Sequence, residues 1–316
     1  MWAYRLDGPL SFSRHDIPEP GLDDVPDGSV VLRFRAGGIC GSDIARCFDG
    51  GSAARPGPFG LSLHEIVGDV VATRSDLPVG ERVVGWVGRS LGLREYIVTE
   101  AEALAPAHPD MDDIEAAPLQ PLACVLHAMT RLGDLTGLRA AVIGMGPIGL
   151  LYGHALKDRG VAHVTGIDLV DRTEVASEFG FDETESVIGR AWSADNQNRF
   201  DLVIEAVGHQ VGTMQNAIDV VAPGGTVVYF GNPDERYYQL HLGAMMDRAL
   251  TLQCGRTPRD MRRRALASAT AYLRANPGTL DGYVTEVVDV HDANSAYLRA
   301  SRPAVGQRKV VLQAPV

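Results

Sequence analysis

Long apolar runs and clustered cysteines are both missing from this chain of 316 residues. No stretch reaches the roughly 18 apolar residues that a membrane-spanning helix needs, and the N-terminal MWAYR lacks the apolar region of a signal peptide. The four cysteines, Cys40, Cys47, Cys124 and Cys254, are too few and too dispersed for a secreted disulfide framework. These absences predict a cytoplasmic protein whose thiols stay reduced.

Positive charge is also scarce, because 29 Lys and Arg residues face 40 Asp and Glu residues, for a net charge of −11. Nucleic acids and anionic membrane surfaces repel such a chain, so neither is expected as a partner. A small anionic cofactor is still compatible, since cofactor sites use local dipoles rather than global charge. The length and the 45% hydrophobic content indicate a globular protein of about two domains.

The first third of the chain has the pattern of β-strands. Apolar and charged side chains alternate over residues 32–36, which predicts a half-buried strand. Further strands are expected at 66–72, 82–87 and 96–98, with a turn around Pro78 and Gly80. This pattern is typical of an antiparallel, barrel-like domain.

From about Pro121 onward, strand and helix patterns alternate, which predicts an α/β fold with a parallel sheet. A helix is expected to follow residue 149 and to stop at Gly160. Residues 223–225, Pro-Gly-Gly, are interpreted as a turn. The strands are expected at residues 140–143, 164–167, 200–207 and 226–230, and a last strand at 309–312.

A glycine-rich motif lies between one predicted strand and the following helix: Gly144-Met145-Gly146-Pro147-Ile148-Gly149. In this context G-x-G-x-x-G is typical of dinucleotide binding. Gly144 allows the tight turn, Gly146 lets the backbone approach a pyrophosphate, and Gly149 lets the helix pack on the strand. The N-terminus of the following helix then offers unpaired N–H groups and a positive dipole end to the phosphates, and Pro147 and Ile148 are expected to line the cofactor site.

Asp168 lies 19 residues beyond Gly149, at the end of the next predicted strand. A carboxylate there accepts hydrogen bonds from the ribose hydroxyls of NAD and repels the 2′-phosphate of NADP, so NAD is the expected cofactor. Arg172, one turn further on, is the residue that could reverse this preference. The alternative is an ordinary strand–helix turn with Asp168 as a solvated acid.

Two short segments carry metal-ligating side chains, Cys40 in GICGSD and His64-Glu65 in LHEIVG. A thiolate and a neutral imidazole are ligands that zinc prefers. Glu65 is interpreted as a further ligand or as a neighbour of the ligands, and Asp43 is expected to orient His64. Singly, Cys40 and His64 would be ordinary buried side chains, but together they predict a catalytic metal site.

These motifs, in this order, resemble the medium-chain dehydrogenase/reductase family, in its zinc-type alcohol, sorbitol and threonine dehydrogenase branch. The resemblance implies a split GroES-like catalytic domain, residues 1–120 and 256–316, around a Rossmann domain, residues 121–255, with Val207 in the cofactor site. It also implies a homodimer or homotetramer formed near residues 250–254. The motifs that carry it are GICGSD at 38–43, HEIVG at 64–68, GERVV at 80–84, QPLACVLHA at 120–128, GMGPIG at 144–149, FDLVIEAVG at 200–208 and PGGTVV at 223–228.

The chain departs from the family pattern at three places. No cysteine lies between Gly88 and Tyr96, where relatives carry a structural-zinc lobe, so no structural Zn²⁺ is expected. Gln120 stands where polyol-type relatives have a third ligand, a glutamate; with Cys40 and His64 it would leave a bound Zn²⁺ at net +1. Glu65 or Cys124 are the alternatives for completing the site. Ala45 replaces a histidine that carries the proton onward in alcohol-type relatives.

The family resemblance implies hydride transfer between a secondary alcohol, of polyol, sugar or cyclitol type, and NAD. The predicted zinc acts as a Lewis acid, and Ser42 accepts the hydroxyl proton, unless its hydroxyl only caps a local turn. Lys309 is interpreted as a surface residue at a strand end, with a cofactor phosphate contact as the alternative. Two other functions stay open: a zinc-free, NAD(P)H-dependent enone or quinone reductase, and a non-catalytic NAD-binding sensor or partner protein.

Overall fold

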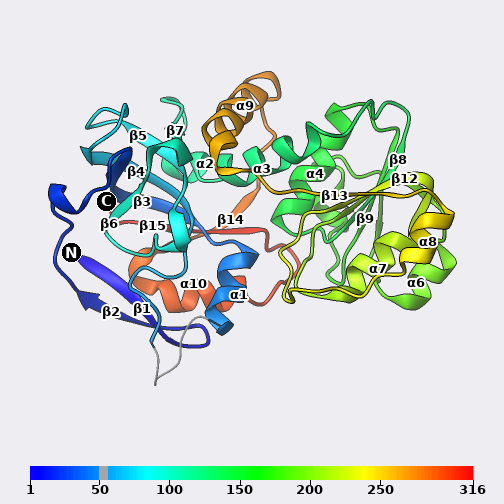
Figure 1. The fold of residues 1–316 in the computed structure, drawn as a ribbon, viewed down its shortest axis with the longest axis horizontal. Coiled ribbons are helices and arrows are strands. Elements are labelled where there is room, and N and C mark those ends of the chain that lie inside the picture. Colours follow the sequence, from blue (N-terminus) through cyan, green and yellow to red (C-terminus); the bar gives the residue numbers. More distant parts are fainter. Residues whose placement is uncertain (50–55, 316) are drawn as a thin grey trace. The chain divides into compact units, whose positions relative to one another are not determined.

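The structure is a computed structural model that describes residues 1–49 and 56–315 (Figure 1). Its contacts divide the chain into two compact units, which are treated separately below. The first unit comprises Met1–Ala123, Pro258–Pro303 and Gln307–Val316, and the second comprises Cys124–Thr257 and Ala304–Gly306.

The first unit is built on a sheet whose strand order is β14-β15-β3-β4-β5-β7, with β6 also paired to β3. Neighbouring strands are antiparallel except β14 and β15, which are parallel. A separate hairpin joins β1 and β2. The bounds are β1 Trp2–Gly8, β2 Ser11–Asp16, β3 Ser29–Gly38, β4 Glu65–Thr73, β5 Arg82–Trp86, β6 Tyr96–Glu100, β7 Leu104–Pro106, β14 Val284–Asp289 and β15 Lys309–Gln313.

Helices cover this sheet and close its core. On α10 the residues that face the core, Ala293, Ala296 and Tyr297, follow the helical spacing of three to four residues. In the strand β3, Leu32 and Phe34 point into the same core, as the alternation predicts. The α-helices are α1 Gly41–Asp49, α2 Asp113–Ala116, α9 Arg262–Ala275 and α10 Ala293–Ala300; short 3₁₀ turns lie at Leu22–Asp24, Gly88–Ser90, Ala101–Ala103, Arg259–Met261 and Val290–Asp292.

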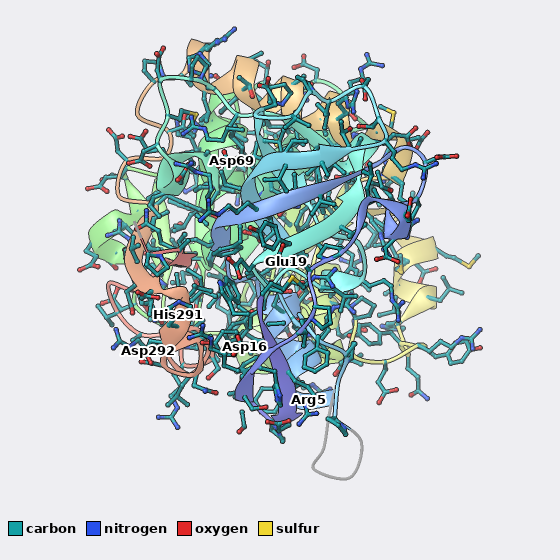
Figure 2. The ribbon with its side chains drawn as sticks, turned by 90° about the vertical axis from the view of Figure 1, so that its left-hand side faces the viewer. Arg5, Asp16, Glu19, Asp69, His291 and Asp292 are labelled. Atoms are coloured by element: carbon teal, nitrogen blue, oxygen red, sulfur yellow. The ribbon has the colours of Figure 1, made fainter. Side chains whose placement is uncertain are left out.

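The surface of the first unit reflects the negative charge of the chain. Asp16, Glu19 and Asp292 are exposed and are labelled in Figure 2. Among the described residues, no helix combines the length and the apolar composition needed to cross a membrane.

The second unit holds a parallel sheet of six strands in the described part of the chain, in the order β10-β9-β8-β11-β12-β13 (Figure 1). The helix α4 packs on β8 and β9, and α7 packs on β11 and β12. The bounds are β8 Arg139–Ile143, β9 His163–Ile167, β10 Glu183–Glu185, β11 Phe200–Glu205, β12 Val221–Tyr229, β13 Thr251–Cys254, α3 Leu119–Met129 (which begins in the first unit), α4 Pro147–Asp158, α5 Thr173–Ala176, α6 Arg190–Asp195, α7 Val211–Val220 and α8 Leu242–Asp247.

The order of these strands creates a topological switch point. From β8 the chain builds outward to β9 and β10, and then returns to place β11 on the other side of β8. Ligands of open α/β sheets bind at the carboxyl ends of the two strands where this reversal occurs. In this unit those ends lead into Gly144 and Ala206. The predicted fold class, a Rossmann-type parallel sheet plus a β-rich domain, is confirmed.

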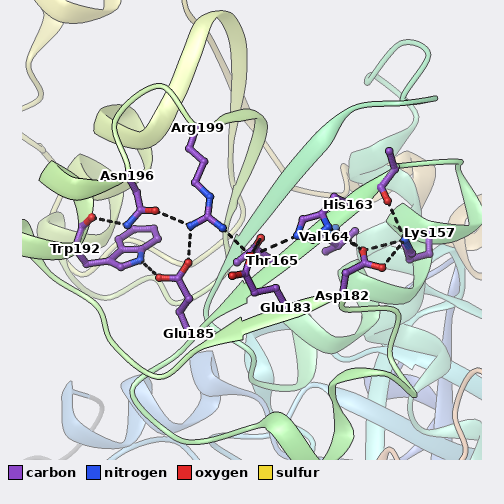
Figure 3. A network of polar contacts seen from close by, with 11 residues as sticks. Lys157, His163, Val164, Thr165, Asp182, Glu183, Glu185, Trp192, Asn196 and Arg199 are labelled. Carbon is purple, nitrogen blue, oxygen red and sulfur yellow. Dashed lines mark hydrogen bonds and ion pairs between the residues drawn. The ribbon is translucent and has the colours of Figure 1, made fainter.

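Polar contacts tie the edge strand β10 to its surroundings (Figure 3). Arg199 Nη1 lies 2.7 Å from Glu185 Oε1, and Arg199 Nη2 lies 2.6 Å from Glu183 Oε2. The Trp192 indole also donates to Glu185. Further along the sheet, Asp182 accepts from Lys157 Nζ at 2.9 Å. The contacts of Glu183 and Glu185 link β10 to α6 and to the residue that precedes β11.

The Pro223-Gly224-Gly225 segment was expected to be a turn, but the structure includes it in β12. The register explains the difference. Val221 pairs with Phe200, whereas Thr226 pairs with Leu202, so the Pro-Gly-Gly segment bulges out between two paired stretches of one strand. Gly224 has φ +75°, as a bulge permits, and its N–H donates to Arg248 O at 2.7 Å.

Candidate active site

A cluster of possible metal ligands forms where β3 and β4 pair. Gly38 on β3 lies opposite Glu65 on β4, which places Cys40, just beyond β3, next to the start of β4. Ligand atoms of Cys40, His64 and Glu65 all lie within 4.8 Å of one another. The antiparallel register therefore brings together two motifs that are separated in the sequence.

Asp43 contacts two members of this cluster, Cys40 and His64. Its carboxylate is fully buried, and its Oδ1 lies 2.8 Å from His64 Nδ1 and accepts from Ser62 Oγ at 3.0 Å. Its Oδ2 accepts the Cys40 N–H at 3.1 Å. An ionised carboxylate only accepts, so His64 Nδ1 carries the proton and Nε2 is left for a ligand. The expected contact between Asp43 and His64 is thus present.

The environment of His64 strongly favours binding of a positive charge. Burial by itself lowers the pKa of the imidazole, but the Asp43 carboxylate and Cys40 raise it well above its ordinary value. A metal ion must therefore displace a proton from this ring, which couples metal binding to proton release.

Glu65 is paired with a lysine from the other end of the chain. Lys309 Nζ lies 2.6 Å from Glu65 Oε2, and the two side chains are 2% and 1% exposed. The interpretation of Lys309 as a surface residue is therefore wrong. Burial by itself lowers the pKa of Lys309, but Glu65 and Cys40 raise it above its ordinary value. The sequence signal that was available is the position of Lys309 at the start of an apolar strand.

The donor atoms in this cluster fit zinc. A thiolate, an imidazole and a carboxylate are all ligands of catalytic zinc sites. Gln120, on α3, is buried, and Ser42 is half-buried in the first turn of α1, two residues after Cys40. Ala45 lies on the same helix one turn later and offers no proton-carrying group.

In the second unit, the glycine-rich motif forms the turn from β8 to α4. A Cβ on Gly149 would lie 1.8 Å from Gly144 O, so only glycine permits this turn. Gly144 has φ +94°, and a Cβ there would lie 2.7 Å from the side chain of Val207. By contrast, nothing lies within 4 Å of a Cβ placed on Gly146, the N-cap of α4. This open space at the N-terminus of α4, where Pro147 and Ile148 begin the helix, fits a pyrophosphate.

Asp168 stands at the end of β9, beside this turn. Its Oδ2 accepts the Met145 N–H at 2.7 Å and its Oδ1 accepts the Val170 N–H at 2.9 Å. Each oxygen keeps a second lone pair for a ribose hydroxyl. Arg172 is buried, and its Nη1 donates to Ala304 O at 3.0 Å.

Glu205, at the end of β11, was not singled out from the sequence. It is fully buried and accepts hydrogen bonds from Gly208 N at 3.0 Å and Thr213 Oγ1 at 2.8 Å, while Val207 N donates at 3.2 Å. Burial raises the pKa of this carboxyl, and these donors oppose the rise. Glu205 therefore positions the loop that carries Val207. The sequence feature that could have identified Glu205 is the position of a glutamate at the end of an apolar strand.

The second unit is thus a dinucleotide-binding fold, and the first unit carries a cluster suited to a catalytic metal. These two features are typical of metal-assisted oxidoreductases. Residues 26–109 match the family of alcohol dehydrogenase GroES-like domains, and residues 147–268 match the zinc-binding dehydrogenase family.

Individual proteins that are similar to this chain are also alcohol and polyol dehydrogenases. D-altritol 5-dehydrogenase of Agrobacterium fabrum is 32% identical over 266 residues, covering 70% of this chain and 74% of the relative. Sorbitol dehydrogenase of Bacillus subtilis is 26% identical, covering 75% and 76%. The crystal structure of 2R,3R-butanediol dehydrogenase from Bacillus subtilis superposes with a TM-score of 0.79 at 22% identity, covering 99% of each chain. The chain belongs to the zinc-type medium-chain dehydrogenase/reductase family, among its alcohol and polyol dehydrogenases.

Proposed function

We propose that this protein is a zinc-dependent dehydrogenase that transfers a hydride between a secondary alcohol, of polyol, sugar or cyclitol type, and NAD. The observation that carries the proposal is the cluster of Cys40, His64 and Glu65, with Asp43 fixing the imidazole. Support for the substrate class comes from relatives that are named as dehydrogenases of D-altritol, L-idonate and sorbitol.

The residues of the first unit have separate roles in this proposal. Cys40 and His64 would hold the zinc, and Glu65, Gln120 or Cys124 would complete the site. Bound there, zinc would supply the Lewis acidity that lowers the pKa of a substrate hydroxyl. Ser42 accepts the hydroxyl proton and passes it to water or to a cofactor hydroxyl, because Ala45 cannot carry it further.

The preference for NAD rests on two residues of the second unit. The carboxylate of Asp168 binds the ribose hydroxyls and repels a 2′-phosphate. Arg172 is the residue that could act as a counter-charge for that phosphate, and in the structure its guanidinium is buried and donates to Ala304 O. The site around the phosphates and the nicotinamide ring of the cofactor is shaped by Gly144, Gly146, Gly149 and Val207.

We further propose that the chain forms a homodimer, or a tetramer built from such dimers, through the sheet edge at β13. Leu252 on this edge strand is 40% exposed, and Met246 on the preceding α8 is 73% exposed. An uncovered edge strand with apolar neighbours is a site that proteins usually cover.

Turnover with a panel of polyols, cyclitols and simple secondary alcohols tests this function. NADH formation should require zinc, should stop on treatment with a chelator and should return when Zn²⁺ is added back. Metal-independent reduction of enones or quinones would instead indicate a zinc-free reductase. NAD binding without any turnover would indicate a sensor or partner protein.

A further inference from the structure

We propose that Lys309 sets the electrical charge of the metal centre: it cancels the charge of Glu65, so that a bound divalent ion keeps more of its own positive charge. This inference rests on the proposed function. It assigns to Lys309 a positioning and charge-setting role toward the same site, and it explains why a buried cation stands beside residues that bind a cation.

The geometry leaves this pair little freedom. The distance of 2.6 Å between Lys309 Nζ and Glu65 Oε2 is that of a direct ion pair, and both side chains are shielded from water. The backbone of Lys309 is held because its N–H donates to Tyr283 O at 3.1 Å. Glu65 is held because it pairs on β4 with Gly38 and with Trp86.

Gly38 forms the wall against which the pair packs. A Cβ there would lie 2.4 Å from Glu65 Oε2 and 2.7 Å from Lys309 Cε. Any other residue at position 38 would therefore push the carboxylate and the ammonium out of place. Gly38 is two residues before Cys40, so the ion pair lies directly beside the backbone that presents the thiolate.

The charges explain what the pair does. Cys40 as a thiolate and Glu65 as a carboxylate would together neutralise a divalent ion. Lys309 cancels one of these two negative charges, because a buried ion pair acts at a distance almost as a neutral unit. The centre then keeps a net positive charge. A more positive centre binds its metal less tightly but is a stronger Lewis acid.

Three variants test this role. Lys309→Met removes the positive charge, Lys309→Arg keeps it, and the double variant Lys309→Met/Glu65→Gln removes both charges. Zinc affinity is measured by competition with a chelator, and the ligand field is measured from the visible spectrum of the cobalt(II)-substituted protein. Lys309→Met should bind zinc about 10- to 100-fold more tightly. Lys309→Arg and the double variant should return close to the wild-type affinity and spectrum.

The pH dependence of alcohol oxidation gives a second readout. Without Lys309 a bound zinc would be a weaker Lewis acid and would lower the pKa of the substrate hydroxyl less. The pH profile should therefore move to higher pH in Lys309→Met and should match the wild-type profile again in Lys309→Arg. If Lys309→Met binds zinc no more tightly than wild type, with an unchanged cobalt spectrum, the proposal is overturned.

A buried Glu65 without its partner could prevent Lys309→Met from folding. The comparison is then between Glu65→Gln and the double variant Lys309→Met/Glu65→Gln. The double variant should bind zinc more tightly than Glu65→Gln, since the two proteins differ only in the positive charge of Lys309. Equal affinities in these two proteins would overturn the proposal. If wild type itself binds no zinc, the proposed function fails; if wild type binds zinc and oxidises alcohols while the variants match it, only the role of Lys309 fails.

Discussion

The Asp43 carboxylate and the His64 imidazole lie 2.8 Å apart, and the same carboxylate accepts the Cys40 N–H at 3.1 Å. The buried Asp43 thus holds two of the proposed zinc ligands: it contacts the side chain of His64 and the backbone N–H of Cys40. This contact fixes the tautomer of His64 and the direction of the chain at Cys40 before any metal arrives. Much of the metal affinity should therefore depend on a residue that need not touch the metal.

Replacing Asp43 by Asn should lower zinc affinity by about 10- to 100-fold, because the amide no longer favours a proton on His64 Nδ1. Chelator competition measures the effect. Asp69→Asn is the matched control, because Asp69 pairs with Arg35 on the same sheet, and its removal should leave zinc affinity unchanged. Equal zinc affinity in Asp43→Asn and wild type would contradict the role given to Asp43.

Cofactor choice should change when Asp168 is replaced by Asn. Losing the charged acceptor should lower kcat/KM for NAD by about tenfold or more, and the gap between NAD and NADP should narrow because the repulsion of the 2′-phosphate is gone. Steady-state kinetics with both cofactors measure this. Asp171→Asn, in the same loop, should leave the ratio as it is. An unchanged ratio in Asp168→Asn would show that another group selects the cofactor.

Gly149→Ala should destabilise the protein by about 2–3 kcal/mol and weaken NAD binding, because the new Cβ would lie 1.8 Å from Gly144 O. Gly212→Ala is the matched control. Nothing lies within 4 Å of a Cβ at Gly212, which is exposed in α7, so this change should stabilise by about 0.5 kcal/mol. Denaturant unfolding gives both values, and a Gly149→Ala protein as stable as wild type would contradict the turn geometry.

Asp182 should contribute to stability in a pH-dependent way. Partial burial by itself raises the pKa of Asp182. The hydrogen bond from Val164 N–H and the charge of Lys157 lower this pKa by more than burial raises it, so the pKa in the folded protein lies below the ordinary value. A carboxyl group whose pKa is lowered by folding stabilises the folded protein at pH values above its pKa in the unfolded chain. This contribution is lost as the pH falls through its pKa in the folded protein. Asp182→Asn should therefore cost about 1 kcal/mol near pH 7, a value reduced by solvent screening.

Urea unfolding of wild type and Asp182→Asn between pH 7 and about pH 2 measures this contribution. The two curves should differ at neutral pH and converge in acid. The control is Asp158→Asn, an exposed acid on the neighbouring part of α4. A difference that stays constant down to acid pH would mean that Asp182 acts through packing rather than through its charge.

Local patterns in the sequence predict the parts of the fold that depend on neighbouring residues. The alternation at residues 32–36 predicts β3, and the glycine motif between two apolar segments predicts the turn from β8 to α4. The Pro-Gly-Gly segment at 223–225 shows the limit. Its composition is that of a turn, and only pairing with Phe200 and Leu202 on another strand makes it a bulge within β12.

The candidate site divides in the same way. Cys40 and His64 are recognisable because each lies in a short motif, and Asp43 is only three residues from Cys40. The start of an apolar strand was a signal that Lys309 is buried, but its contact with Glu65 could not be predicted from the sequence, because that contact depends on β15 pairing with β3 from the other end of the chain. A lysine at a strand end usually lies at the surface, and only this tertiary pairing buries it.

Zinc stoichiometry in the purified protein tests the central claim most directly, when Cys40→Ser is compared with Cys47→Ser. Cys47 is buried, and its pKa is raised to about 12 by burial and by Asp43, so it should play no part in metal binding. Wild type and Cys47→Ser should each hold about one zinc ion per chain, and Cys40→Ser should lose the metal and alcohol oxidation together. An active wild type without metal, or a Cys40→Ser protein that keeps its zinc, would contradict the account.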